Sequence, residues 1–408
     1  MNEKRVAGFD VHKETVVACV LGERVNPSKA PVRTFQTNTR ALLEMRAWLK
    51  EQGVVEICME STGVYWKAIY AMLEDEPAWK LVVANAQHVK NVPGRKTDVK
   101  DAQWLAHLLR SGLLRPSFVP PVEIRELRDL TRYRTNLVEE RTRERNRVLG
   151  VLQCANIKLD GVASDVFGVS GMLMLRAMAK GECCAKKLAQ LAKGHLRKKI
   201  EALEVALEGR LVAHHQALLQ MSLGRLDQTE KDIEAIEAMI DAKLEPYRAQ
   251  HQRLQQIPGV DATVAASILA ELGPDMSVFP TAGHAASWAG ICPGNHESAG
   301  KRQSGRPTPG NPHLKTVLCQ AANAASRKKG SYFKDKFYRL RARRGHKCAV
   351  MAIGHKILVA AYHMLRTGND YQDLGETYLD QRDAAHVAQQ LVRRLNTLGY
   401  DVELKKAA

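Results

Sequence analysis

Aromatic residues are scarce in this chain, and its cysteines form no motif. Aromatic residues make up 5% of the 408 residues, so an aliphatic core must support most of the fold. The eight cysteines stand singly apart from the pair Cys183 and Cys184, and no CxxC pair has a partner at zinc-site spacing. These absences argue against a disulfide-stabilised domain and against a structural zinc site, and we expect reduced thiols.

Long hydrophobic runs are also missing. No uninterrupted apolar run reaches about 18 residues, the length that a membrane-spanning helix requires. The chain starts MNEKRVAGFDVHKE, in which no long apolar region follows the charged residues, so no secretory signal is expected. We therefore expect no membrane partner and a cytoplasmic, nucleoid-associated protein.

Positive charge is what the chain has in excess. Its 61 Lys and Arg residues outweigh 44 Asp and Glu residues, which gives a formal net charge of +17. A charge of this sign favours a polyanionic partner such as a nucleic acid. The hydrophobic share of 45% is ordinary for a globular protein, and the length predicts two or three folding units.

Residues 1–120 are predicted to form an α/β domain. The apolar spacing predicts strands and helices in alternation, with two strands within 4–21, a helix over 38–52, a strand at 54–59, a helix over 65–73, a strand at 81–84 and a helix over 98–109. Strands that alternate with helices are typical of a sheet with crossover connections. Pro116, Pro120 and Pro121 mark the end of this domain.

From Glu123 onward the pattern is helical, and residues 121–253 are expected to form a helical, coiled-coil segment. Residues 123–157 interleave leucines with arginines and acids. This pattern fits either a solvated face with ion pairs one turn apart or a helix that tracks nucleic acid. Farther on, apolar residues from Leu196 to Leu244 recur at steps of three and four, as in a long antiparallel hairpin or a dimeric coil.

A C-terminal domain is predicted at 254–369, followed by a peripheral helical tail at 370–408. Residues 254–269 suggest two helices joined by a turn at Pro258 and Gly259. In a helix-hairpin-helix such a turn offers its amides to a phosphate, but a plainly packed helical hairpin fits the pattern nearly as well.

Residues 290–360 concentrate the positive charge. Fifteen Lys and Arg residues in this range face only two acids, Glu297 and Asp335. A solvated surface normally mixes both signs, so we expect this segment to contact nucleic-acid backbone, with binding that weakens as salt rises. The residues assigned to this contact are Lys301, Arg302, Arg306, Lys315, Arg341, Arg343 and Arg344.

Four carboxylates stand out by their positions. Asp10 and Glu60 lie at predicted strand ends, and Asp98 and Asp101 lie three residues apart on one face of a predicted helix. Such a set can converge on a hard cation, and all-oxygen ligation suits Mg²⁺ or Mn²⁺. Singly, each acid has a plainer interpretation, since Asp98 follows the potential N-cap Thr97 and strand-end acids are often only solvated. Together, in a basic chain, they favour a metal site.

Several short blocks of this sequence resemble those of the DEDD transposases of the IS110 family. The similar N-terminal blocks are Gly8–Lys13, Glu60–Trp66 and Lys96–Ala102. The blocks that look like the family's C-terminal transposase domain are Ile257–Val260, Trp288–Gly294, Ser298–Lys301 and Gly310–Lys315. The resemblance covers roughly residues 4–365, and the blocks occur in the family's order and at its spacing.

The resemblance implies an RNase H/RuvC-like N-terminal domain, a coiled-coil insertion and a C-terminal domain whose nucleophile is Ser298. It implies a transposase that excises and inserts its element through a phosphoserine link to DNA, with Asp10, Glu60, Asp98 and Asp101 holding Mg²⁺. It also implies an element-encoded guide RNA that pairs with target and donor DNA, so that base pairing selects the sequence.

The residues themselves leave alternatives open. A serine in an exposed basic loop, followed by Lys301 and Arg302, can bind a phosphate without attacking it, and Ser304 is a rival nucleophile. His12 and His296 are candidate acids or bases. A RuvC-like nuclease that uses a metal-activated water, and a non-catalytic nucleic-acid scaffold, are the competing functions. Because two duplexes must be cut and exchanged, we expect a homo-oligomer of even order, a dimer that pairs into a tetramer on DNA.

Overall fold

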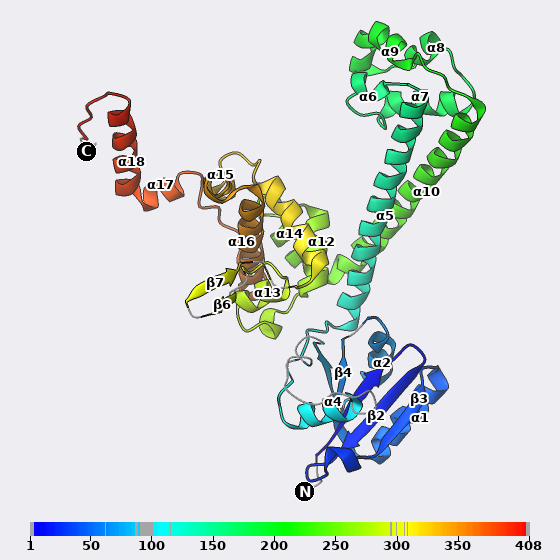
Figure 1. Ribbon diagram of the computed structural model, residues 1–408, viewed down its shortest axis with the longest axis vertical. Coiled ribbons are helices and arrows are strands. Elements are labelled where there is room, and N and C mark those ends of the chain that lie inside the picture. The colour runs from blue at the N-terminus through cyan, green and yellow to red at the C-terminus, as the bar shows by residue number, and fades with distance from the viewer. Residues whose placement is uncertain are drawn as a thin grey trace. The chain divides into compact units, whose positions relative to one another are not determined.

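The chain divides into two compact units, Met1–Val119 and Pro120–Ala408. The structure is a computed structural model. It describes residues 4–61, 63–85, 89, 101–114, 116–293, 296–298, 300–305, 307 and 309–404, and of residues 296–298 and 302–304 it describes the backbone only. Figure 1 shows the elements of each unit.

The first unit is built on a mixed five-stranded sheet. Its strands are β1 (Arg5–Val11), β2 (Thr15–Leu21), β3 (Val32–Gln36), β4 (Val54–Glu60) and β5 (Lys80–Ala84), in the order β3-β2-β1-β4-β5. The pairs of β2 with β1 and β3 are antiparallel, and the pairs of β4 with β1 and β5 are parallel. The predicted strands are confirmed. β3 was not predicted, because this edge strand buries only Phe35 and its other residues are partly or fully exposed.

Helices cover both faces of this sheet. α1 (Thr39–Glu51) and α2 (Trp66–Leu73) bury one core with Phe9, Ile57 and Met59. α4 (Asp101–Arg110) packs on the other face against Cys19 and Cys58. This arrangement is compatible with the RNase H-like domain that the family resemblance implies.

The second unit begins with two long helices that lie side by side, α5 (Val122–Cys154) and α10 (Ala213–Leu244) (Figure 1). They run antiparallel, since Arg134 pairs with Glu237 at 2.6 Å and Arg141 pairs with Glu230 at 3.0 Å. Leu137 packs between them with residues of α10. Arginines of α5 therefore pair with acids of the facing helix α10, a partner that the sequence pattern did not predict, as well as with acids one turn away on α5, as Arg143 does with Glu139 and Glu140.

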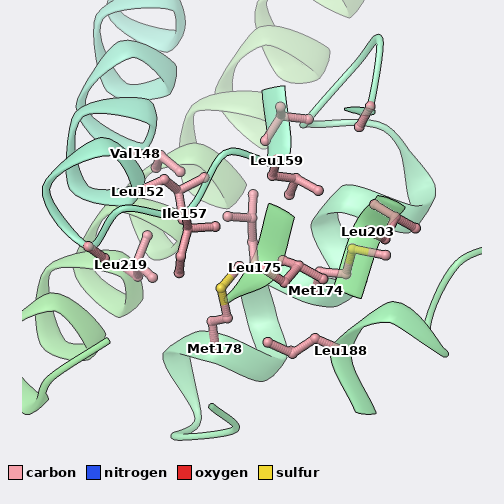
Figure 2. Packing of buried hydrophobic residues seen from close by; sticks show 14 of the residues in the cluster. Val148, Leu152, Ile157, Leu159, Met174, Leu175, Met178, Leu188, Leu203 and Leu219 are labelled. Carbon is pink, nitrogen blue, oxygen red and sulfur yellow. The ribbon is translucent and has the colours of Figure 1, made fainter. Parts of the chain in front are cut away.

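A small helical cap joins the far ends of α5 and α10. It contains α6 (Leu159–Val162), α7 (Val169–Ala179), α8 (Ala185–Ala189), the 3-10 helix η3 (Gly194–Lys199) and α9 (Ile200–Leu207). Figure 2 shows its core, in which Met174, Leu175, Leu188 and Leu203 pack together. We call the helix pair and its cap, residues 122–244, the arm.

The cap corrects the prediction of one continuous seam from Leu196 to Leu244. The first half of that pattern belongs to the cap core, and α9 ends at Leu207. The chain then passes so close to the end of α5 that a Cβ on Gly209 would lie 2.5 Å from Ala155 O. Only the second half lies on α10, where α5 of the same chain covers part of it.

The C-terminal part is mostly helical. Its elements are η4 (Glu245–Tyr247), α11 (Arg248–Leu254), α12 (Ala262–Leu272), η5 (Met276–Val278), α13 (Ala282–Trp288), β6 (His296–Ser298), β7 (Lys301–Ser304), α14 (Pro312–Ala325), α15 (Tyr332–Arg344) and α16 (His346–Thr367). α16 is long and apolar enough to cross a membrane, but half of its most apolar stretch is buried. It packs against α13, α14 and α15, as the core helix of a domain does.

The turn between α11 and α12 packs against protein. The amides of Ile257 and Val260 donate to Leu254 O and Ile257 O, at 3.1 and 3.0 Å. Gly259 has a φ of +85°, and a Cβ there would lie 2.2 Å from Ala321 O in α14. These contacts favour the packed helical hairpin over a phosphate-binding turn. Beyond α16, α17 (Tyr378–Arg382) leads to α18 (Ala384–Thr397), which has no buried residue.

Candidate functional site

Two of the four carboxylates end neighbouring parallel strands. Phe9 of β1 and Met59 of β4 are register partners, and both point into the core beneath α1 and α2. Asp10 and Glu60 are the next residues. Because successive side chains on a strand alternate between faces, Asp10 and Glu60 lie on the other face, which α4 covers.

The third carboxylate, Asp101, begins α4 on that same face. At the other end of α4, Arg110 Nη1 donates to Gly22 O at 2.9 Å and to Val25 O at 2.8 Å. Gly22 follows the end of β2, which pairs with the start of β1. The beginning of α4 must therefore lie toward the carboxyl end of β1, so Asp10, Glu60 and Asp101 share one face and one end of the sheet.

Glycine in β1 permits this close packing. A Cβ on Gly8 would lie 2.3 Å from Ala102 O and 2.4 Å from Ala106 N, so α4 rests directly on the strand backbone. Only a residue without a side chain fits there. Gly8 thus sets the height of Asp101 above the sheet.

Partial exposure and nearby charge define the electrostatics of this end. Asp10 Oδ2 lies 3.0 Å from His12 Nε2, and 21% of the Asp10 side chain is exposed. Burial, and secondarily the charge of Glu60, raises the pKa of the Cys58 thiol to about 12. Cys58 and Glu60 are two residues apart on β4, so both lie on the face that α4 covers.

Carboxylate oxygens of this kind are the ligands that Mg²⁺ and Mn²⁺ prefer. Asp98 lies outside the described residues. Among the described residues no three His, Cys, Asp or Glu side chains form a group that could hold a metal ion. The four-carboxylate metal site stays a prediction.

Ser298 lies at the tip of a β-hairpin. β6 and β7 pair antiparallel, with Ser298 opposite Lys301 and His296 opposite Ser304. Gly300 in the connection has a φ of +73°, the left-handed region that glycine adopts readily. The exposed basic loop that the sequence suggested around Ser298 thus contains a short antiparallel strand pair. The two candidate nucleophiles are also separated, since Ser298 borders the turn and Ser304 lies at the open end.

The segment that carries the hairpin leaves and rejoins the domain at one point. Asn311 N donates to Trp288 O at 2.9 Å, and a Cβ on Gly310 would lie 2.2 Å from Gly290 N. The Asn311 side chain also caps α14, because its Oδ1 accepts from the amides of His313 and Leu314. The ends of residues 291–310 are therefore held together at the start of α14.

A buried glutamate beside this point was missed from the sequence. Glu271 of α12 is 2% exposed. Its carboxylate accepts from Arg132 Nε and Nη2 at 2.7 and 2.9 Å, and from Asn311 Nδ2 at 2.6 Å. Arg128 Nη2 donates to the Glu271 backbone carbonyl at 2.8 Å, and burial lowers the pKa of Arg128 to about 10. The signal in the sequence was an acid inside the apolar run of residues 264–272.

The predicted backbone-binding residues occupy different environments. Lys301 is exposed beside the hairpin turn, and Lys315 of α14 is half-buried. Arg341, Arg343 and Arg344 are exposed in the last turn of α15, where the negative end of the helix dipole favours cations. The side chain of Arg302 and all of Arg306 lie outside the described residues.

Comparison with known proteins identifies the class. Residues 7–157 match a model of DEDD transposases of the IS110 type, described as "Transposase", and residues 251–338 match the model "Transposase IS116/IS110/IS902 family". One matching segment contains the acid-bearing sheet and the other contains the serine hairpin. Both matches identify the class as a transposase, whose partner is DNA. The chain belongs to the IS110 family of transposases.

Curated relatives agree with this assignment. The chain is 28% identical to an "Insertion element IS110 uncharacterized 43.6 kDa protein" of Streptomyces coelicolor, over 69% of this chain and 73% of the relative. It is 27% identical to a "Transposase for insertion sequence element IS1111A" of Coxiella burnetii, over 91% of this chain and 92% of the relative. A "Probable family 20 transposase" of Pseudomonas aeruginosa is 26% identical over 58% of this chain and 61% of the relative.

Proposed function

We propose that the protein is a cytoplasmic DNA recombinase that excises and inserts its own insertion sequence through a phosphoserine link at Ser298. The observation that carries this proposal is that Asp10, Glu60 and Asp101 share one face and one end of the sheet, in a chain that also has Ser298 beside a hairpin turn. Acids at a sheet end can hold a divalent cation, and a serine at a tip can reach a DNA backbone.

In the proposed reaction the Ser298 hydroxyl attacks a DNA phosphate. A bond forms between Ser298 Oγ and phosphorus, the bond from phosphorus to one deoxyribose oxygen breaks, and the serine proton passes to a base while that oxygen takes up a proton. Attack by a deoxyribose hydroxyl of another strand reverses these changes, so the phosphodiester is conserved without an external energy source. Lys301, opposite Ser298 in the hairpin, would attract the phosphate.

The acids would prepare the phosphate for this attack. Asp10, Glu60, Asp98 and Asp101 would hold Mg²⁺ or Mn²⁺, which supplies positive charge that offsets the charge of the phosphate when bound. His12, 3.0 Å from Asp10, would orient that carboxylate.

We further propose that an element-encoded RNA guides the protein and that it acts as an even-numbered homo-oligomer. The family resemblance and the excess of Lys and Arg support the RNA partner. The acids lie in the first unit and the serine in the second. The arm separates the two segments along the chain, which favours a composite site that takes its serine and its acids from different subunits.

Trapping the covalent adduct tests the serine. Wild-type protein, Ser298→Ala and Ser304→Ala variants are incubated with end-labelled donor DNA and the guide RNA, and are then denatured. We expect a protein–DNA adduct from wild type and Ser304→Ala, and none from Ser298→Ala. An adduct lost only in Ser304→Ala would move the nucleophile to Ser304. Metal-dependent nicking without any adduct would instead establish the alternative RuvC-like nuclease.

Complementation tests the composite site. Ser298→Ala and Asp10→Ala proteins, each inactive alone, are mixed under conditions in which mixed oligomers form. We expect cleavage to return in part, because some sites then combine an intact serine with intact acids. No recovery in assemblies shown to be mixed would favour sites built within one chain.

A further inference from the structure

The tip of the arm carries exposed cations with few acids among them. Six of them lie within residues 186–199, a stretch that contains no Asp or Glu. All six are exposed, in α8, in the 3-10 helix η3 and in the segment between them. We call these residues the tip cations: Lys186, Lys187, Lys193, Arg197, Lys198 and Lys199.

In the lower part of the arm, unlike at the tip, arginines are ion-paired to acids of the same chain. There Arg134 and Arg141 are ion-paired to acids of the opposite helix. At the tip, Lys187 lies 3.5 Å from Glu182, but among the described residues no acid lies within ion-pair distance of Lys186, Lys193 or Lys198. The lower cations stabilise the arm itself, whereas the tip cations leave their charge available to an external anion.

The tip cations stand on a folded support. The cap core holds α8 through Leu188 and α9 through Leu203 (Figure 2). Arg197 Nε donates to Ala192 O at 3.2 Å, and Lys199 Nζ donates to Val162 O at 3.3 Å, which ties η3 to its neighbours. Because the cap holds the backbone that carries these cations, binding to a regular polyanion requires ordering of their side chains alone.

We propose that the tip cations form a second nucleic-acid site, which binds the phosphate backbone of a duplex independently of its sequence. Residues 186–199 contain no Phe, Tyr or Trp that could stack on unpaired bases, so a duplex suits the tip better than a single strand. The 32 residues of α10 correspond to roughly 48 Å of helix. The tip can therefore contact phosphates of a duplex that lie well away from the base of the arm.

This site lies outside the segments by which the family is recognised. The two matching segments are residues 7–157 and 251–338, and the tip cations lie between them. The tip binds backbone whether or not Ser298 is the nucleophile, so the inference stands apart from the proposed chemistry.

A charge-reversal variant of the full chain tests the site. Lys186, Lys193 and Lys198 are replaced by Glu, since none of them forms an ion pair with another residue that the structure describes. Binding to a 30-base-pair DNA of random sequence, to the RNA duplex of the same sequence and to a single-stranded RNA is measured by fluorescence anisotropy from about 50 to 300 mM salt. A matched control reverses three exposed cations elsewhere, Lys231, Arg393 and Arg394.

The tip variant should bind duplex about tenfold more weakly than wild type, with a slope of log affinity against log salt that is smaller by about three. The control should keep the wild-type slope. A loss confined to the DNA duplex or to the RNA duplex identifies the natural ligand, and an equal loss on both supports binding by backbone charge alone. The proposal is overturned if the tip variant binds like wild type, if the control loses as much, or if only the single-stranded RNA is affected.

Discussion

Arg132 and Glu271 form a bidentate ion pair where the arm meets the C-terminal part of the same unit. Nε and Nη2 of Arg132, in α5, donate to the two carboxylate oxygens of Glu271, in α12, at 2.7 and 2.9 Å. Asn311, the residue that caps α14, donates to the same carboxylate. One buried group therefore holds together the arm, α12 and the point from which the serine hairpin extends.

Replacing Glu271 by Ala should strongly destabilise the second unit. The change removes a carboxylate that is 2% exposed and leaves Arg132, and the more deeply buried Arg128 at 3.2 Å, without their acidic partner, which costs about 3–5 kcal/mol of unfolding free energy. The pair of Arg134 with Glu237 provides the control, because the Glu237 side chain is 45% exposed and Glu237→Ala should cost less than about 1 kcal/mol. Urea unfolding of both variants measures the difference, and equal costs would show that burial does not set the strength of the Glu271 pair.

Gly8→Ala should displace α4 and weaken DNA cleavage. The new methyl group would meet the backbone of α4 at less than 3 Å, so the helix must move away from β1, at a cost of about 1–3 kcal/mol. Because Asp101 begins this helix, cleavage should fall as well. Gly150→Ala is the control, since that helical position has open space and should gain about 0.5–1 kcal/mol. Wild-type thermal stability of Gly8→Ala would contradict the close packing.

Asp10→Asn, Glu60→Gln and Asp101→Asn should each abolish stabilisation by Mg²⁺. A cation that binds only the folded state raises the melting temperature, and this rise requires the carboxylates that hold the ion. Strand cleavage should fall by about 100-fold or more in the same variants. Glu56→Gln, two residues from the start of β4 and paired with Lys80, should respond to Mg²⁺ like wild type. A normal response in the Asp10 variant would refute the metal assignment.

Folding stability should decline above about pH 9 in part through two buried thiols. Burial raises the pKa of Cys58 from 9.0 to about 12 and that of Cys19 to about 11. Between 9 and 11 the unfolded thiols lose protons that the folded ones keep, so unfolding becomes more favourable as pH rises, by at most about 1.4 kcal/mol per pH unit for each thiol.

Comparing cysteine variants isolates this effect from other alkaline titrations. Urea unfolding at pH 8 and pH 10 should show a smaller loss in Cys19→Ala/Cys58→Ala than in wild type. Cys154→Ser changes an exposed thiol and should leave the loss unchanged. A loss in the double variant as large as in wild type would rule the thiols out as its source.

Replacing Arg341, Arg343 and Arg344 together by Gln should weaken nucleic-acid binding without altering sequence preference. Phosphate contacts carry no base information, so affinity should fall alike on every sequence, and the salt slope should shrink by about three. Arg339→Gln is the control, because Asp335 and Asp380 already pair with that residue. Selection of binding sites from random DNA would reveal a changed preference, which would mean that these arginines read bases.

The local pattern of the sequence predicted most elements of the first unit. Strands such as β4 are short apolar runs between turns, and helices such as α1 show apolar residues at helical spacing, so each is recognisable without its neighbours. β3 escaped because an edge strand buries little. The family blocks likewise depend on residue identity and order, which is why the sequence alone identified a DEDD transposase of the IS110 family.

Tertiary structure decided what each repeated pattern packs against. The apolar steps from Leu196 to Leu244 look continuous in the chain, yet half of them fill the cap and half face α5, because the backbone turns at Gly209. The arginines of α5 suggested nucleic acid or ion pairs equally, and only the facing acids of α10 and α12 distinguished the two. Sequence fixes the chemistry of a side chain, but its partner depends on which distant segment folds against it.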